Sequence, residues 1–284
     1  MEQKKKYLTA LTIAGSDSGG GAGIQADLKT FSSLGIFGTS AITAITAQNT
    51  LQVRSIEILP PHIVRDQLAA VLDDFTIHAA KTGMLPTPET VELVAWAMDA
   101  YRLPALVVDP VMRSTSGSSL VDERIVEAFR GLLYPRLTLL TPNIVEASIL
   151  SGIHIKEESD IHRAADVLLG QGCRAVLIKG GHLIGGQAVD RLFTPHRPMA
   201  AFASPFIETS NLHGTGCTLS AAIAAFLAQG DELTQAIGRA KRYVTSAIEA
   251  GKDRISGRGN GPLNHFFDPQ TMACPDEKSA PKNE

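Results

Sequence analysis

The chain has 284 residues, and its 26 Lys and Arg against 29 Asp and Glu give a formal charge of −3 with histidine neutral. This balance argues against a protein that binds nucleic acid or an anionic membrane surface, because both recruit concentrated positive charge. Hydrophobic residues make up 44% and charged residues 19%, which excludes a disordered chain and predicts a globular protein with a buried core.

Strand-like runs alternate with amphipathic helical segments along most of the chain. The sequence predicts strands at Leu8–Ala14, Ala79–Thr82, Ala105–Val108, Leu137–Leu140 and Ala175–Ile178. It predicts helices near Ile24–Leu34, Pro88–Tyr101, Val121–Leu133, Ile144–Ser151, Asp160–Gln171, Thr215–Gln229 and Thr234–Gly251. This alternation is typical of an α/β fold, in which a mostly parallel sheet is covered by helices on both faces.

Two stretches break the alternation, because strand-like runs follow one another without a helix between them. They are Gly38–Leu59 and Gly185–Ala203, and each is interpreted as an edge hairpin or as a small flap over a site. After Lys252 the composition turns to Gly, Pro, Asn and charged residues. We therefore expect a single domain over residues 1–256 and a mostly mobile tail over residues 257–284.

The cysteine content and the N-terminus bear on the cellular location. Cys173, Cys217 and Cys274 form no Cys-x-x-Cys pair, so neither a disulfide framework nor a zinc cluster is expected. No apolar run approaches the roughly 18 residues of a membrane span, and no signal-peptide core follows the first lysines. The sequence thus predicts a cytoplasmic protein.

The segment from His213 to Thr218 contains Gly214 and Gly216 and directly precedes a strong helix pattern. Exposed backbone N–H groups and the positive end of a helix together bind anions, so this segment is predicted to hold a phosphate. An ordinary helix cap is the alternative. Cys217 falls in the first turn, where the helix dipole is expected to lower the pKa of its thiol, and it could act as a general base toward a hydroxyl or serve only to pack or position substrate.

A second glycine-rich segment, Gly15–Gly23, follows the first predicted strand and opens a helix that contains Asp27. Ligands of open α/β sheets bind beyond the carboxyl ends of the strands, so Asp27 is a candidate for a hydrogen bond to a polar ligand. Its alternative role is that of an acid near a helix N-terminus. Gln48 and Asn49 end another strand-like run, and an amide that both donates and accepts suits the edge of a heterocycle.

Three charged residues also fall at the ends of predicted strands or just after them: Asp109, Glu146 and Lys179. Two carboxylates can hold Mg²⁺ directly or through waters, and a lysine can contact phosphates during their transfer. Each residue alone could be a cap, a surface acid or a lysine reaching to solvent. Together with the predicted phosphate cradle they favour a phosphoryl-transfer site.

Five segments then strongly resemble the hydroxymethylpyrimidine/phosphomethylpyrimidine kinase family of thiamine biosynthesis, which has a ribokinase-like fold. The resemblance runs in order from about Leu8 to Gly251 and is carried by Ala14–Asp27, Thr43–Asn49, Asp109–Met112, Thr141–Asn143 with Glu146, and His213–Cys217. It implies a three-layer α/β/α fold and an ATP-dependent kinase. Such a kinase phosphorylates 4-amino-5-hydroxymethyl-2-methylpyrimidine to the monophosphate and then to the diphosphate.

The resemblance also implies roles for individual residues. The pyrimidine pocket would be lined by Gly15, Asp27, Gln48, Met84 and Val111. The anion hole and its neighbouring thiol would be formed by Gly214, Thr215, Gly216 and Cys217. Asp109 and Glu146 would serve Mg²⁺, while ATP phosphates would contact Asn143, Lys179 and Lys241.

Two rival functions remain open at this stage. Pyridoxal kinase shares the fold and the phosphate apparatus, although Cys217 and the Gly15–Asp27 segment favour the pyrimidine enzyme. A non-catalytic nucleotide-binding or sensor protein could also keep the fold, but the presence of Asp109, Glu146 and Lys179 argues against it. The resemblance further implies a homodimer, to which the Gly38–Leu59 region could contribute.

Overall fold

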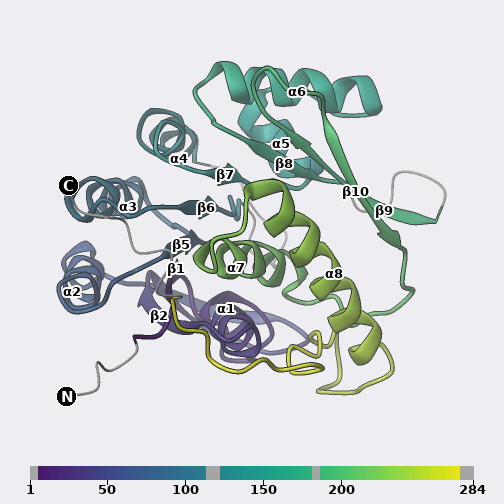
Figure 1. The fold of residues 1–284 in the computed structure, drawn as a ribbon, viewed down its shortest axis with the longest axis horizontal. Coiled ribbons are helices and arrows are strands. Elements are labelled where there is room, and N and C mark those ends of the chain that lie inside the picture. Colours follow the sequence, from purple (N-terminus) through teal and green to yellow (C-terminus); the bar gives the residue numbers. More distant parts are fainter. Residues whose placement is uncertain (1–5, 113–121, 181–185, 276–284) are drawn as a thin grey trace.

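The central sheet is read from the computed structural model, which describes residues 6–112, 122–180 and 186–275. Its strands are β1 (Thr9–Ala14), β2 (Phe37–Ile42), β5 (Ala79–Thr82), β6 (Leu106–Val108), β7 (Leu139–Leu140), β8 (Val176–Lys179), β9 (Gln187–Phe193) and β10 (Ala200–Pro205). Their order is β10-β9-β8-β7-β6-β5-β1-β2 (Figure 1). Strands β2 to β8 of this sheet run parallel, and β9 and β10 add antiparallel pairs at one edge, which confirms the predicted mostly parallel α/β sheet.

Helices cover both faces of the sheet and make three layers (Figure 1). One face carries α2 (Pro61–Leu72), α3 (Pro88–Tyr101), α4 (Glu123–Ala128) with its π-helical continuation η1 (Phe129–Leu133), α5 (Ile144–Ser151) and α6 (Glu158–Gly170). The other face carries α1 (Gly23–Ser33), α7 (Thr215–Ala228) and α8 (Leu233–Gly251). None of these described helices combines the length and the apolar character that crossing a bilayer requires.

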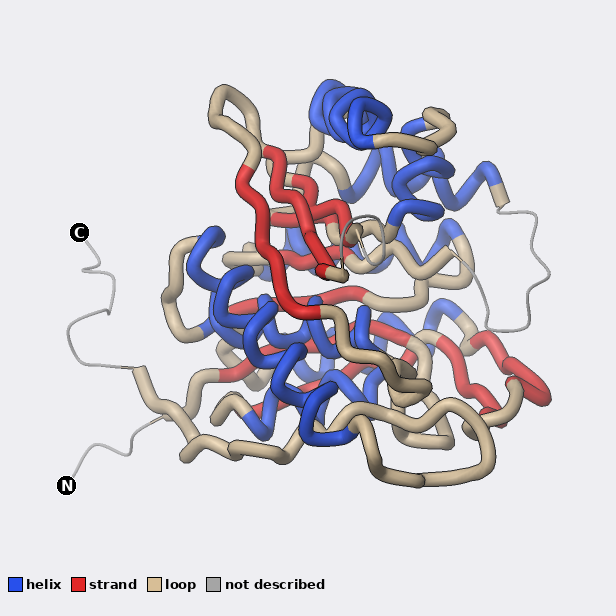
Figure 2. The backbone as a smooth tube through the Cα atoms, turned by 90° about the vertical axis from the view of Figure 1, so that its right-hand side faces the viewer, coloured by secondary structure: helices blue, strands red, loops and turns tan. Residues whose placement is uncertain are grey.

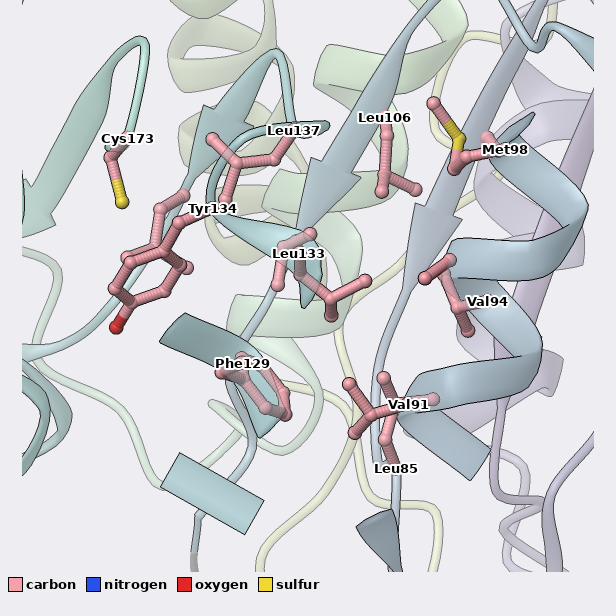
Figure 3. Packing of buried hydrophobic residues seen from close by; sticks show 14 of the residues in the cluster. Leu85, Val91, Val94, Met98, Leu106, Phe129, Leu133, Tyr134, Leu137 and Cys173 are labelled. Atoms are coloured by element: carbon pink, nitrogen blue, oxygen red, sulfur yellow. The ribbon is translucent and has the colours of Figure 1, made fainter. Parts of the chain in front are cut away.

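Strand β6 shows why the buried strands are almost continuously apolar. Leu106 and Val108 pack into the hydrophobic cluster on one face, while Val107 packs into the cluster on the other. Successive side chains of a strand point to opposite faces, so a strand covered on both sides needs apolar residues at every position. Figure 3 shows the first cluster, with Val94 of α3 and Leu133 of η1 around Leu106.

The two irregular stretches have different structures. Within the first, β2 joins the main sheet, while β3 (Ala44–Gln48) and β4 (Val53–Ile58) form a separate antiparallel hairpin. The second is an edge hairpin of β9 and β10, and its expected start at Gly185 lies outside the described residues. Figure 2 shows the β3–β4 hairpin at the end of the molecule opposite the two termini.

Helix α2 is absent from the sequence prediction, although the chain carries a signal for it. Val64, Leu68 and Leu72 recur every four residues and are the buried positions of this helix. Pro61 occupies its first turn, where the missing N–H of proline costs nothing. The start of the predicted helix at Val121 lies outside the described residues, and the described part begins at Glu123.

The segment over residues 257–275, part of the predicted tail, makes specific contacts with the body of the protein. Leu263 and His265 are buried. Ser33 Oγ and Tyr243 Oη both donate to the carbonyl oxygen of His265, at 2.6 and 2.8 Å. The Leu8 amide donates to the Ala273 carbonyl at 2.9 Å. The remainder of the predicted tail, 276–284, lies outside the described residues.

Acidification is expected to destabilise the fold through His265. Burial lowers the pKa of His265 from 6.5 to about 4, and its Nε2 lies 3.0 Å from Thr218 Oγ1. The unfolded chain therefore binds more protons than the folded one between these values, and stability falls as pH drops through this window, by on the order of 3 kcal/mol. Urea unfolding at pH 7 and pH 5 tests this. The His265→Phe variant should lose less stability between the two pH values, and an equal loss in both proteins would contradict it.

Candidate active site

Two cavities open at the carboxyl ends of the parallel strands, on either side of the start of α7. The α8 cavity, of about 320 Å³, is lined by Lys179, Gly216 and residues of α8 such as Lys241 and Val244. The hairpin cavity, of about 120 Å³, is lined by Cys217 and by residues of the β1, β5 and β3–β4 ends. The first turn of α7 therefore touches both cavities.

Gly214 sets the geometry of this turn. Its φ of 85° lies in the left-handed region, and a Cβ at this position would come within 1.8 Å of the Gly21 carbonyl oxygen. Only glycine fits both conditions. Among the described residues, the amides of Gly214, Gly216 and Cys217 have no protein hydrogen-bond partner, as expected for N–H groups at a helix start. These amides can therefore bind an anion.

Thr215 does not contribute its amide as predicted. Its N–H and its hydroxyl both donate to the Leu212 carbonyl oxygen, at 3.2 and 2.7 Å. The amide of Cys217 is available in its place. The predicted anion hole thus keeps Gly214 and Gly216, while Thr215 serves to shape the turn.

The cation of the site is Lys179, at the end of β8. Its Nζ donates to Asp109 Oδ1 at 2.8 Å, and both side chains are largely buried. A Cβ on Gly216 would lie 3.4 Å from Lys179 Nζ, so the ammonium group faces the free amides across a small gap. Although burial by itself lowers the pKa of Lys179, the charges of Asp109 and Glu146 raise it above its ordinary value. Lys179 therefore stays charged at neutral pH.

Asn143 and Glu146 form the start of α5. The Asn143 amide donates to Glu146 Oε2 at 2.8 Å, and the Glu146 amide donates to Asn143 Oδ1 at 2.9 Å. This capping box fixes both side chains at the carboxyl end of β7. Burial, with a contribution from the charge of Asp109, raises the pKa of Glu146 to about 7. A positive charge in addition to that of Lys179 would stabilise the carboxylates of Glu146 and Asp109.

Four of the five residues predicted for the pyrimidine pocket line the hairpin cavity, and Cys217 lies with them. The four are Gly15, Gln48, Met84 and Val111. The residues predicted for ATP line the α8 cavity, namely Asn143, Lys179 and Lys241. The structure thus brings the two predicted groups to two cavities that both include residues of the first turn of α7 in their lining.

Asp27, the fifth of these residues, is not among the residues that line the hairpin cavity. Its side chain is fully buried. Both carboxylate oxygens lie 2.8 Å from Lys81 Nζ, and Thr12 Oγ1 donates to Oδ2 at 2.6 Å. The side chain therefore lies behind the cavity wall in a buried ion pair.

The surroundings of Cys217 act against the lowered thiol pKa that its helix position predicts. Burial raises the pKa of its thiol to about 11, although the nearby Lys81 acts in the opposite direction. Desolvation of the thiolate outweighs the helix dipole, which is worth only about 1 kcal/mol at a helix end. At neutral pH the thiol form therefore predominates, and it can donate a hydrogen bond.

Comparison with known proteins decides the family. The sequence pattern of the family described as phosphomethylpyrimidine kinase matches residues 17–264. The hydroxymethylpyrimidine/phosphomethylpyrimidine kinase of Rhizobium meliloti is 48% identical over 258 residues, which cover 90% of this chain and 96% of that protein. The chain belongs to the phosphomethylpyrimidine kinase family. It has the ribokinase-like fold that the sequence predicted.

Two other similar proteins are a longer bifunctional protein and a pyridoxal kinase. A thiamine biosynthesis bifunctional protein of Geobacter sulfurreducens is 50% identical over 262 residues, which cover 91% of this chain but only 52% of that protein. The chain thus spans about half of that relative. The structure of an ADP complex of Bacillus subtilis pyridoxal kinase matches with a TM-score of 0.82 and 39% identity, and the match covers 92% of this chain and 98% of that one.

Three charged residues of this family member were not singled out from the sequence. Lys81 forms the buried pair with Asp27. Asp190 lines the α8 cavity, accepts from Lys241 Nζ at 2.7 Å and so fixes that lysine in place. Asp17 accepts three backbone amides of its own glycine-rich loop and lies 2.8 Å from His213 Nε2. Only Asp17 had a sequence signal, as an acid within a glycine-rich turn.

Proposed function

We propose that the protein is an ATP-dependent kinase that phosphorylates the hydroxymethyl group of 4-amino-5-hydroxymethyl-2-methylpyrimidine and then converts the monophosphate to the diphosphate, in thiamine biosynthesis. The observation that carries the proposal is the first turn of α7, whose unpaired amides lie between the two cavities and face Lys179. The family membership supports the same chemistry. ATP would bind in the α8 cavity and the pyrimidine in the hairpin cavity.

The proposed reaction is an in-line displacement. The hydroxymethyl oxygen bonds to the γ-phosphorus, the bond from that phosphorus to the β–γ bridging oxygen breaks, and ADP leaves with the bridging electrons. The hydroxyl proton is lost late, to an oxygen of the transferred phosphoryl group or to water. The amides of Gly214, Gly216 and Cys217, together with the Lys179 ammonium group, would stabilise the charge on the transferred phosphoryl group. Because the transition state of such transfers is loose, positioning contributes more than a strong base.

Asp109 and Glu146 fit the proposed Mg²⁺ through the chemistry of their donor atoms. Both offer carboxylate oxygens, which Mg²⁺ prefers as ligands, beside the Lys179 ammonium group. The raised pKa of Glu146 indicates that the one positive charge of Lys179 does not fully compensate the two carboxylates. Among the described residues, no cluster of three or more His, Cys, Asp or Glu could hold a metal alone. Mg²⁺ commonly takes its remaining ligands from substrate phosphates and water, and would supply charge neutralisation there.

Substitution of Gly216 is expected to separate activity from stability. A Cβ at this position meets no atom closer than 3.4 Å, but it would occupy the space between the α7 amides and Lys179. Gly216→Ala should therefore keep or raise the urea midpoint, because Ala is the better helix former by about 1 kcal/mol, while kcat/KM for ATP falls about 10²-fold. Equal kcat/KM values in the variant and the wild type would contradict this. Gly214→Ala, by contrast, should fail to fold normally.

Cys217 is expected to orient the substrate hydroxyl without acting as a base. Cys217→Ala should lower kcat at saturating substrate roughly tenfold, well short of the 10²- to 10⁴-fold typical of a lost general base. Because the pKa of the thiol is about 11, wild-type kcat should stay nearly constant from pH 7 to 9. A rise in kcat of about tenfold per pH unit over that range would instead assign the reaction to the thiolate.

A product assay tests the proposed function. The protein is incubated with the pyrimidine alcohol, ATP and Mg²⁺, and the mono- and diphosphates are separated over time. Both products should form in turn. Because the chain is similar to pyridoxal kinase structures, pyridoxal is assayed separately as an alternative substrate. The kcat/KM should be higher for the pyrimidine alcohol than for pyridoxal. A higher kcat/KM for pyridoxal would favour vitamin B6 salvage, and absence of ADP release with either alcohol would contradict a kinase.

We also propose that two copies of the chain associate through the β3–β4 hairpin. Four large apolar side chains of this small element and its loop are between 41% and 55% exposed: Ile45, Leu51, Ile56 and Ile58. Arg54 and Glu57 lie on the same element and offer complementary charges to a second copy. Sedimentation should give a dimer for the wild type and a monomer for Ile45→Asp.

A further inference from the structure

The side chain of Gln48 in the hairpin cavity is contacted by a polar network. His213 Nε2 lies 2.8 Å from Asp17 Oδ2 and 3.3 Å from the Gln48 side-chain nitrogen as drawn in the coordinates. On its other side, Gln48 Oε1 lies 3.5 Å from Thr46 Oγ1. Ser18 Oγ holds the backbone of Gln48 at both its amide and its carbonyl, each at 2.7 Å. The backbone of Gln48 is therefore fixed. Its side-chain amide has two possible orientations, which exchange the oxygen and the nitrogen between His213 and Thr46.

Asp17 determines that the Nε2 atom of His213 carries a hydrogen. Its carboxylate accepts the amides of Gly19, Gly21 and Ala22 at 2.8 to 3.1 Å. Burial acts to raise the pKa of Asp17, but the hydrogen bonds from His213 and these amides lower it below its ordinary value. An ionised carboxylate only accepts hydrogen bonds, so His213 Nε2 must carry a proton and donate it to Asp17.

A protonated Nε2 has no lone pair to accept a second hydrogen bond. The Gln48 atom that faces it must therefore be the carbonyl oxygen, which shares the proton with Asp17. Thr46 leads to the same orientation, because its hydroxyl proton is already donated to the Ser16 carbonyl at 2.9 Å, so Thr46 Oγ1 can only accept from Gln48. Both neighbours require the amide to be turned by 180° from the orientation with its nitrogen toward His213.

We propose that Asp17 and His213 are positioning residues that hold the Gln48 amide with its NH₂ group available to the hairpin cavity, so that the protein selects a heterocycle with a ring nitrogen acceptor at that point. The proposal rests on the proposed function, because it concerns recognition of the pyrimidine alcohol. An exocyclic amino group, which only donates, could not accept a hydrogen bond from the Gln48 NH₂ group. His213 lines the same cavity, and the role proposed for it is exerted through Gln48.

Binding of the pyrimidine alcohol, measured by titration calorimetry without ATP, distinguishes the two amide orientations. Gln48→Ala should weaken the affinity about tenfold, the effect of one lost hydrogen bond. Gln48→Glu should bind at least as weakly as Gln48→Ala, because a carboxylate oxygen would then face the lone pair of the ring nitrogen. Wild-type affinity in Gln48→Glu would overturn the proposal, since it would mean that the carbonyl oxygen faces the ligand.

His213→Phe tests the positioning role. The ring is kept, and Asp17 retains its three backbone donors, so the loop should remain folded, which the urea midpoint checks. The variant should bind the pyrimidine about threefold to tenfold more weakly than the wild type, and it should have no further effect in the Gln48→Ala background. Additive losses, or no loss, would overturn the role. These experiments measure binding and not turnover, so they separate two outcomes. If the wild type and Gln48→Glu bind the pyrimidine equally well, this inference is refuted and the proposed function is not. If the wild type does not bind the pyrimidine at all, the proposed function is refuted as well.

Discussion

Replacement of Lys179 by Met is expected to lower kcat by about 10³-fold. Lys179 Nζ is 2.8 Å from Asp109 and faces the unpaired amides of the α7 turn, where the proposed reaction would place the transferred phosphoryl group. Loss of one preorganised charge at such a position typically costs between 10² and 10⁵ in rate. Steady-state kinetics with saturating pyrimidine and ATP measure the effect.

The control for Lys179→Met must separate catalysis from the cost of an unpaired acid. Lys179→Met leaves Asp109 buried without its cation, whereas the double variant with Asp109→Asn removes both charges. The urea midpoint of the double variant should recover toward the wild-type value and so measures the cost of the unpaired acid, while its activity is not part of the control because Asp109 is itself proposed to hold Mg²⁺. Lys241→Met, in the same cavity but paired with Asp190, should mainly raise the KM for ATP. A kcat within threefold of the wild type in Lys179→Met would refute the assignment.

Replacement of Lys81 by Met is expected to destabilise the fold by about 3–5 kcal/mol. Lys81 and Asp27 are both fully buried, and the charge of Asp27 raises the pKa of Lys81, although burial acts to lower it. Removal of the lysine leaves a carboxylate in the interior with only the Thr12 hydroxyl as a donor. Urea unfolding at pH 7 measures the loss of stability.

The double variant Lys81→Met with Asp27→Leu provides the matched control. It removes both charges and replaces them with apolar groups, so it should recover most of the lost stability, since a buried ion pair contributes little relative to a well-packed apolar pair. If Asp27 instead contacts the substrate, Asp27→Leu should abolish pyrimidine binding while leaving stability intact. Such a result would support the role that the sequence predicted for Asp27.

The sequence predicts the fold well because the strands are buried on both faces. Apolar runs such as Ala105–Val108, each followed by an amphipathic helix, leave little choice but a parallel sheet between two helix layers. The sequence predicts less where the determinants are distant from one another along the chain. The segment around His265 has a loop composition, yet Ser33 and Tyr243 hold it in place. The amino-acid composition of a segment indicates its local conformational preference, but it does not indicate hydrogen bonds to residues far away in the sequence.

The site was predictable where a motif carries the function in its backbone, as at Gly214 and Gly216. It was not predictable where burial decides. Asp27 is close to the site in sequence, but Lys81, 54 residues away, turns it into a structural ion pair. The helix position of Cys217 suggests a low pKa, and only the packing around the thiol shows that desolvation dominates.

The proposed reaction requires the α7 turn to receive the phosphoryl group between the two cavities. A crystal structure with a non-hydrolysable ATP analogue, Mg²⁺ and the pyrimidine alcohol tests it most directly. The γ-phosphate is expected within about 3 Å of the Gly214, Gly216 and Cys217 amides, with the hydroxymethyl oxygen next to it in the hairpin cavity. A γ-phosphate bound elsewhere, or a pyrimidine outside the cavity lined by Gln48 and Met84, would contradict it.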